Sequence, residues 1–183
     1  LQARFTIGAN GVSEVQDASA GFANGTVSAD PVRFTPGKPF PPVALHIRDV
    51  DLEMAAQAFS AKDLRTSGTV DGDLTLTRDA SGRFSLSGKL TGRAPGGLIQ
   101  YDPETVPAFL SGDDPGLETT RKALRDFRYD TLTLDLDGPL DGDLKAQISA
   151  NGTNPAAFGT RPIELNLAIE GAIAPLLRLS SGH

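Results

Sequence analysis

Apolar and polar residues alternate one by one along most of this chain, and this period of two constrains the fold more than any other feature. In residues 70–77, Val70, Leu74 and Leu76 fall on one side, while threonine and aspartate fall on the other. Successive side chains of a strand point to opposite faces of a sheet, so the pattern predicts strands with one apolar and one water-facing side. The Asp-Ala-Ser-Gly turn at 79–82 then predicts a hairpin with residues 84–90.

The same alternation returns at residues 43–47, 131–137, 140–149 and 163–170, and weaker short strands are expected near 5–7, 27–29 and 32–34. Frequent glycine (20) and proline (13) suit strands joined by turns. We therefore expect a mainly β fold with a few short helices, in which a long, curved, antiparallel and meandering sheet forms an open apolar groove. A closed β-sandwich is the alternative, because both folds use the same alternation.

Helical patterns are few. An apolar stripe at residues 52, 55, 56 and 59 predicts one short helix. A helix at about 115–126 is predicted by Asp114 as its N-cap and Pro115 as its first residue, and a short one is expected at about 103–110.

A length of 183 residues is enough for one sizeable domain. We expect residues 1–183 to be a single β-rich segment of a longer chain. Residues 1–91 would form the strand-rich groove segment, and residues 92–183 the C-terminal region that holds the helices at 103–110 and 115–126.

Composition excludes several classes of function. The net charge is -6 and no basic patch occurs, so we expect no nucleic-acid partner. The chain has no cysteine, which excludes disulfides, thiolate metal sites and cysteine nucleophiles. Its apolar runs are all shorter than the 18 residues that a transmembrane helix needs.

Catalytic chemistry is poorly supported. The two histidines, His46 and His183, are isolated, and none of the common nucleophile, zinc or phosphate-loop motifs occurs. We expect no enzyme activity, no catalytic residue, no metal site and no cofactor. An alternative is a β-rich glycan hydrolase that uses paired aspartates in a cleft, one of them with a raised pKa; its candidates are Asp71 with Asp73 and Asp141 with Asp143.

Five short motifs follow one another in the second half of the chain: Gly97-Leu98-Ile99-Gln100-Tyr101-Asp102-Pro103, Phe127-Arg128-Tyr129-Asp130-Thr131-Leu132, Leu136-Asp137-Gly138, Gly152-Thr153-Asn154-Pro155 and Arg161-Pro162-Ile163-Glu164-Leu165-Asn166-Leu167. In order and spacing they resemble the C-terminal region of the YdbH family, one of the AsmA-like envelope proteins alongside TamB and YhdP. The resemblance covers about half of the chain, from about residue 92 to 177.

The resemblance implies a β-sheet bridge, anchored in the inner membrane of a Gram-negative bacterium and crossing the periplasm to the outer membrane. An apolar groove would carry phospholipid acyl chains along it. The C-terminal end would pair with a small outer-membrane lipoprotein of the YnbE type, by strand addition to a free sheet edge. The alternative function is a docking domain that binds this lipoprotein without carrying lipid.

The candidate groove residues are the apolar members of the alternating segments. A groove wall and an ordinary closed core would use the same residues, so both interpretations stay open. The set is Val70, Leu74, Leu76, Phe84, Leu86, Leu90, Leu132, Leu134, Leu136, Leu144, Ile148, Ile163, Leu165, Leu167 and Ile169.

Overall fold

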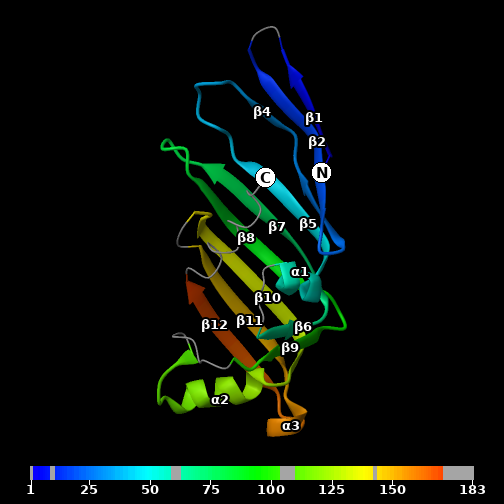
Figure 1. Ribbon diagram of the computed structural model, residues 1–183, viewed down its shortest axis with the longest axis vertical. Helices are drawn as coiled ribbons and strands as arrows, with labels where there is room; N and C mark the ends of the chain where they lie inside the picture. Colours follow the sequence, from blue (N-terminus) through cyan, green and yellow to red (C-terminus); the bar gives the residue numbers. More distant parts are fainter. Residues whose placement is uncertain (1, 9–10, 59–62, 104–109, 142–143, 171–183) are drawn as a thin grey trace.

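The computed structural model describes residues 2–8, 11–58, 63–103, 110–141 and 144–170 (Figure 1). In these residues, twelve strands join into one open antiparallel sheet, accompanied by three short helices. The mainly β fold and the open sheet are confirmed. The sandwich alternative is wrong, because the described strands all belong to the same sheet.

Nine strands follow one path across the sheet, and three short ones pair beside it. The path is β1 (Gln2–Ile7), β2 (Ser13–Phe22), β3 (Gly25–Ala29), β5 (Val43–Asp51), β7 (Thr69–Arg78), β8 (Phe84–Gly92), β10 (Phe127–Pro139), β11 (Lys145–Thr153) and β12 (Ile163–Glu170). Beside it, β4 (Val32–Phe34) pairs with β2, β9 (Gly97–Tyr101) pairs with β10, and β6 (Leu64–Thr66) pairs with β9.

The pairing register lines apolar residues up in rows that cross the sheet. Directly opposed residues of antiparallel strands share a face, so each row lies wholly on one side. The Leu136 row consists of Leu45, Leu74, Gly88, Leu136, Ala146 and Ile169. The Leu134 row beside it consists of Ile47, Gly72, Leu90, Leu134, Ile148 and Leu167. We call the side that carries these rows the apolar face.

The opposite side of the sheet carries charged pairs between neighbouring strands. Lys89 Nζ lies 3.1 Å from Asp135 Oδ1, and Arg48 Nη2 lies 3.0 Å from Asp73 Oδ1. These side chains are exposed, so each pair contributes little to stability. Their positions identify this side of the sheet as the one that faces water, as the alternation predicts.

Two glycines interrupt the rows where β7 and β8 approach each other closely. A Cβ atom at Gly72 would lie 2.1 Å from the carbonyl oxygen of Lys89, and one at Gly88 would lie 2.4 Å from that of Asp73. Among side chains, those of Leu90 and Leu74 come closest to the sites that these Cβ atoms would occupy, at 2.8 and 3.0 Å. Glycine is therefore required at both positions, and the two leucines cover the gaps that the glycines leave in the apolar face.

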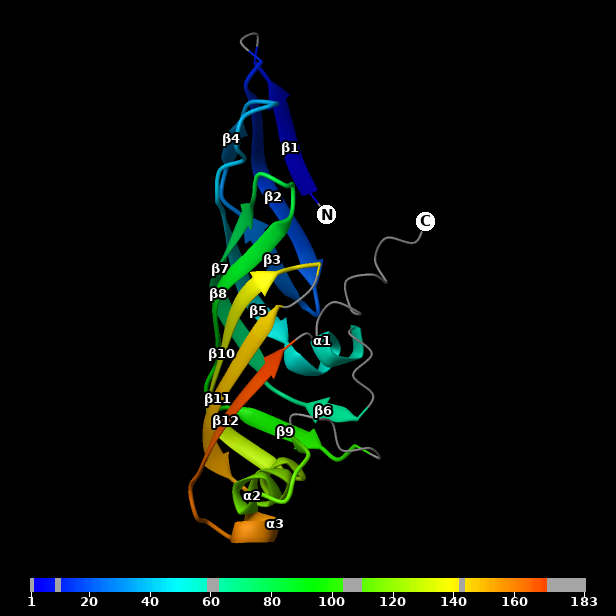
Figure 2. The same cartoon turned by 90° about the vertical axis from the view of Figure 1, so that its left-hand side faces the viewer.

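The helices and the short strands β6 and β9 lie on one side of the sheet, over the half that is lower in Figure 2. Helix α1 (Leu52–Ala58) packs on β5 and β6, and its Ala55 is buried in the same core cluster as Val50 and Val70. The helix therefore covers the apolar face at this end. Its predicted last apolar residue, Phe59, lies outside the described residues.

Helix α2 (Pro115–Leu124) begins at the predicted residue and ends two residues before the predicted position 126. Its N-cap is Asp114, whose carboxylate accepts a hydrogen bond from the Gly116 N–H at 2.6 Å. The other helix predicted in this region, at 103–110, falls almost wholly outside the described residues.

A buried asparagine joins α2 to helix α3 (Pro155–Phe158). Asn154 is 1% exposed, and its Nδ2 donates to the carbonyl oxygens of Lys122 and Ala123, both at 3.0 Å. Its Oδ1 accepts from the N–H of Ala157 at 2.9 Å. One side chain thus forms hydrogen bonds with backbone carbonyl groups at the end of α2 and with a backbone N–H group at the start of α3. These bonds fix α2 beside the β11–β12 connection.

Candidate functional site: the apolar face of the sheet

The predicted groove residues that lie in strands all point to the apolar face, as their pairing register shows. All but Leu76, Phe84 and Leu144 belong to one apolar cluster of the described residues. Leu144 precedes β11 and is 2% exposed. The structure therefore brings the members of the predicted set that lie in strands together on one surface.

Burial divides this set into two classes. Val70, Leu74, Leu132, Leu136, Leu144 and Leu165 are buried. Leu76, Leu86, Leu90, Leu134, Ile148, Ile163, Leu167 and Ile169 are half-buried, and Phe84 is 39% exposed. The first class is a conventional core; the second leaves part of each side chain accessible on the apolar face.

The first half of the sheet contributes more to this face than the sequence analysis assigned. Val43, Ile47 and Val50 of β5 are buried, and Val43 and Ile47 stand opposite Leu76 and Gly72 of β7. The alternation at residues 43–47 was sufficient to place the first two, Val43 and Ile47, on the apolar side of their strand. Val50 breaks the alternation, because the register shifts by one residue between Ile47 and Val50.

This register shift is a β-bulge centred on Asp49, which has a φ of 55°. The N–H of Asp49 donates to Asp71 Oδ1 at 2.6 Å, and its carboxylate pairs with Arg93. The polar side of the sheet thus holds the extra residue, and the bulge turns Val50 onto the apolar face, where it opposes Val70.

Tyr129 is a second buried residue that the alternation did not identify. It is 2% exposed, and its hydroxyl donates to the carbonyl oxygen of Ser67 at 2.8 Å. Burial raises the pKa of this hydroxyl, so it stays a neutral donor. The bond connects β10 to the segment between β6 and β7, at the end of the apolar face that the helices cover.

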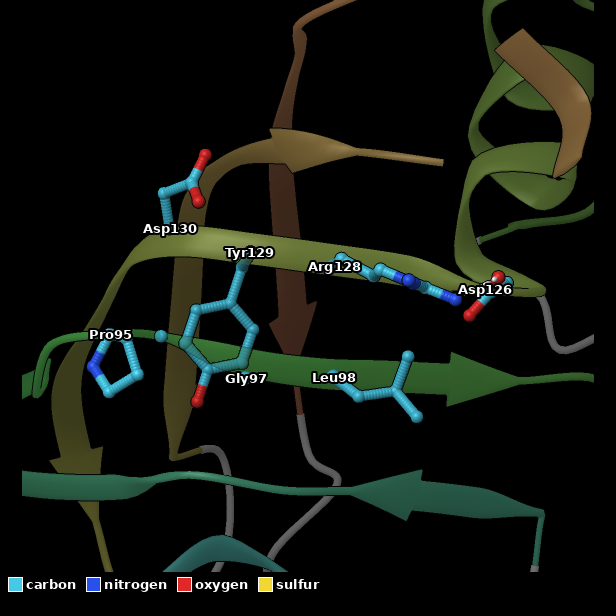
Figure 3. Close-up of a pocket in the computed structure, with 8 residues that line it drawn as sticks. Pro95, Gly97, Leu98, Asp126, Arg128, Tyr129 and Asp130 are labelled. Atoms are coloured by element: carbon cyan, nitrogen blue, oxygen red, sulfur yellow. Dashed lines mark ion pairs between the residues drawn. The ribbon is translucent and has the colours of Figure 1, made fainter. Parts of the chain in front are cut away.

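A shallow depression of about 400 Å³ lies near Tyr129, where β9 meets β10 (Figure 3). The Tyr129 ring points from β10 toward β9 and Gly97, whereas Asp130 points the other way. Arg128 Nη2 lies 3.6 Å from Asp126 Oδ2, so the lining arginine is already paired with a carboxylate. The arginine that lines the depression is therefore not available as an unpaired cation for binding an anion.

Two of the candidate aspartates, Asp73 and Asp141, do not have the properties that the hydrolase alternative predicts for its acid. The hydrolase alternative predicts a carboxyl group with a raised pKa in a cleft. Instead, hydrogen bonds from His46 and Arg48 lower the pKa of Asp73, and Arg83 lowers that of Asp141. Both carboxylates are exposed, so this prediction is wrong for these two residues.

No group of three metal-ligating side chains lies together within the described ranges. Among the described helices, none combines the length and apolar character needed to cross a bilayer.

Fold and site together define a class: an open β-sheet protein whose charged side faces water and whose continuous apolar face is only partly covered by described elements. The family model described as "YdbH-like: Intermembrane phospholipid transport protein YdbH" matches residues 1–181. The chain belongs to this YdbH-like family, and membership implies intermembrane phospholipid transport. The match extends the resemblance from half of the chain to nearly all of it. Searches of curated proteins and of solved structures found no match.

Proposed function

We propose that the apolar face binds the acyl chains of phospholipids, and that this chain is the C-terminal part of a periplasmic bridge between the inner and outer membranes. The observation that carries the proposal is the pair of apolar rows, each of which crosses six strands without a polar side chain. Family membership supports the choice of phospholipid as the ligand.

The energetics of acyl-chain binding suit such a surface. Transfer of apolar area out of water contributes about 25 cal/mol per Å² and needs no directional contact. In the Leu134 row, Leu90, Leu134, Ile148 and Leu167 are all half-buried and therefore still have apolar area to cover. An acyl chain laid on this row would remove that area from water together with its own.

The second candidate function is docking to a small outer-membrane lipoprotein. In the described part of the chain, β12 pairs only with β11, so the N–H and C=O groups along its other edge have no strand partner. An added strand would satisfy these groups. This function needs no lipid on the apolar face.

Native mass spectrometry with lipid extraction tests the first proposal. Wild type is compared with Leu134→Asp and with Thr133→Asp, which places the same charge on the opposite face of β10. We expect phospholipid to co-purify with wild type and Thr133→Asp, and to be lost from a folded Leu134→Asp. Absence of lipid from wild type, together with unfolding of Leu134→Asp, would show that the face is a closed core.

The docking alternative makes a different prediction for the same variants. A lipoprotein that adds to the edge of β12 contacts backbone groups, so its binding should be equal for wild type and a folded Leu134→Asp. A binding assay with the purified lipoprotein therefore separates the two functions.

A further inference from the structure

Arg78 is a cation on the apolar face. In β7, the register with β8 continues without a shift from Val70 to Arg78, which stands opposite Phe84. Leu76, two residues earlier, stands opposite Leu86. Arg78 therefore points to the same side as Leu76 and lies one row beyond it, where the apolar face meets the β7–β8 turn.

Aromatic and backbone groups hold the Arg78 side chain at this rim. Its Cζ lies 5.6 Å from the centroid of the Phe84 ring, and its Nε donates to the Gly82 carbonyl oxygen at 3.3 Å. A Cβ atom at Gly82 would lie 3.1 Å from Arg78 Nη2, so the glycine leaves space for the guanidinium. Phe84 also contacts the Phe40 ring edge-on, with centroids 6.4 Å apart.

No carboxylate of the described ranges forms an ion pair with Arg78. Asp79, the adjacent acid, uses its Oδ1 to accept from the Ser81 N–H at 2.8 Å and the Arg83 N–H at 3.0 Å, inside the turn. Arg83, on the same hairpin but the opposite face, is bound by Asp141 through Nε at 3.1 Å and Nη2 at 3.0 Å. The two arginines of one hairpin thus differ in whether their charge is neutralised.

We propose that Arg78 binds the phosphate group of a phospholipid whose acyl chain lies on the apolar face beside Leu76 and Leu86. The inference rests on the proposed function and adds a position for the head group. A guanidinium binds phosphate through paired, charge-assisted hydrogen bonds. At the rim, the head group stays in water while the tail contacts the half-buried leucines and the exposed Phe84.

Two ligands with the same acyl chain test the site, lysophosphatidylglycerol with the phosphate and monoacylglycerol without it. Each is titrated by calorimetry, below its micelle concentration, into the 183-residue wild type, Arg78→Gln and Arg83→Gln. Loss of a charge-assisted phosphate contact should weaken lysophosphatidylglycerol binding to Arg78→Gln about tenfold and leave monoacylglycerol binding unchanged. Arg83→Gln should bind both ligands as wild type does, and thermal unfolding checks that both variants are folded.

The outcomes separate failure of the site from failure of the proposed function. If wild type binds both ligands and Arg78→Gln binds lysophosphatidylglycerol equally well, the Arg78 site is refuted while lipid binding stands. An equal loss of both ligands also refutes the phosphate contact. If wild type binds neither ligand, the proposed function itself fails. Inorganic phosphate is titrated alone, and binding as tight as that of lysophosphatidylglycerol would identify a site for the free anion and refute the lipid assignment.

Discussion

His46 Nδ1 lies 2.7 Å from Oδ1 of Asp73, the residue directly opposite it on β7. The other ring nitrogen, Nε2, lies 2.9 Å from Asp30 Oδ1. Both nitrogens thus face carboxylate oxygens, an arrangement that is satisfied only when both carry a proton. The hydrogen bond to Asp73 raises the pKa of His46 most, and the one to Asp30 raises it further. The bond between His46 and Asp73 also lowers the pKa of Asp73.

The first prediction is a pH dependence with a definite sign. Because the pKa of His46 is higher in the folded than in the unfolded state, its contribution to stability is complete below the unfolded value of about 6.5. That contribution is lost as pH rises through the folded pKa. Asp73 contributes above its unfolded pKa and loses its contribution only at a lower, acidic pH. Urea unfolding of wild type between pH 5.5 and 8.5 should therefore show the contribution of His46 to the free energy of unfolding decreasing as pH rises.

Asp73→Asn checks this assignment, with Asp135→Asn as the control on the same side of the sheet. NMR titration should give a lower His46 pKa in Asp73→Asn and an unchanged one in Asp135→Asn, whose carboxylate pairs with Lys89. An unchanged His46 pKa in Asp73→Asn would contradict the interaction.

The second prediction compares two leucines on the same face of β10. Leu132 is buried, whereas Leu134 is half-buried. Leu132→Ala should lower the free energy of unfolding by about 2–5 kcal/mol, because it removes buried atoms and leaves a cavity. Leu134→Ala should cost about 1–2 kcal/mol, because less of its area is buried. Chemical denaturation of both variants measures the difference, and equal costs would mean that the whole face is closed core.

The third prediction concerns the close approach of β7 and β8. Gly72→Ala should destabilise the fold by roughly 1–3 kcal/mol, because its Cβ would overlap the Lys89 carbonyl oxygen. Gly21→Ala is the matched control in a strand, since the nearest atom to its Cβ would be 3.9 Å away. Thermal unfolding distinguishes them, and a neutral Gly72→Ala would show that the two strands separate easily.

The fourth prediction concerns the asparagine that joins α2 and α3. Asn154→Ala removes the side-chain hydrogen bonds to the Lys122 and Ala123 carbonyl oxygens and to the Ala157 N–H, which should cost about 1–3 kcal/mol. Hydrogen exchange should accelerate at the end of α2. Asn151→Ala removes only an exposed bond to Thr131 Oγ1 and should stay within about 0.5 kcal/mol of wild type. Unchanged exchange in α2 would show that Asn154 does not position the helix.

Local alternation was enough to predict the strands around Leu74, Leu134 and Leu167 and the face that they share. It failed where a bulge changes which side a residue faces. One such bulge is at Asp49, and the register between β1 and β2 shifts near Asp17, which has a φ of 53°. Strand β2, ten residues long, was not predicted, because its small and polar residues show no clear period.

Strand order and the open edges could not be predicted from local pattern. Whether Leu134 faces a second sheet or an accessible surface depends on pairings between residues far apart in the chain, and alternation is the same in both cases. Arg78 was missed for a related reason. Alternation puts residue 78 on the side of Leu76, but Arg78 directly precedes the predicted turn at 79–82, and only the register with Phe84 shows that the strand continues through it.

The spacing of the strands sets the length of the two apolar rows. Neighbouring strands lie about 4.8 Å apart, so a row that crosses six strands is roughly 24 Å long. One leaflet of a bilayer, half of a hydrocarbon core about 30 Å thick, is shorter than this. On the proposed function, a lipid tail lying along a row would contact about four strands and could move by one strand at a time. At each step it would exchange one aliphatic neighbour for another, so movement along the sheet would meet only small barriers.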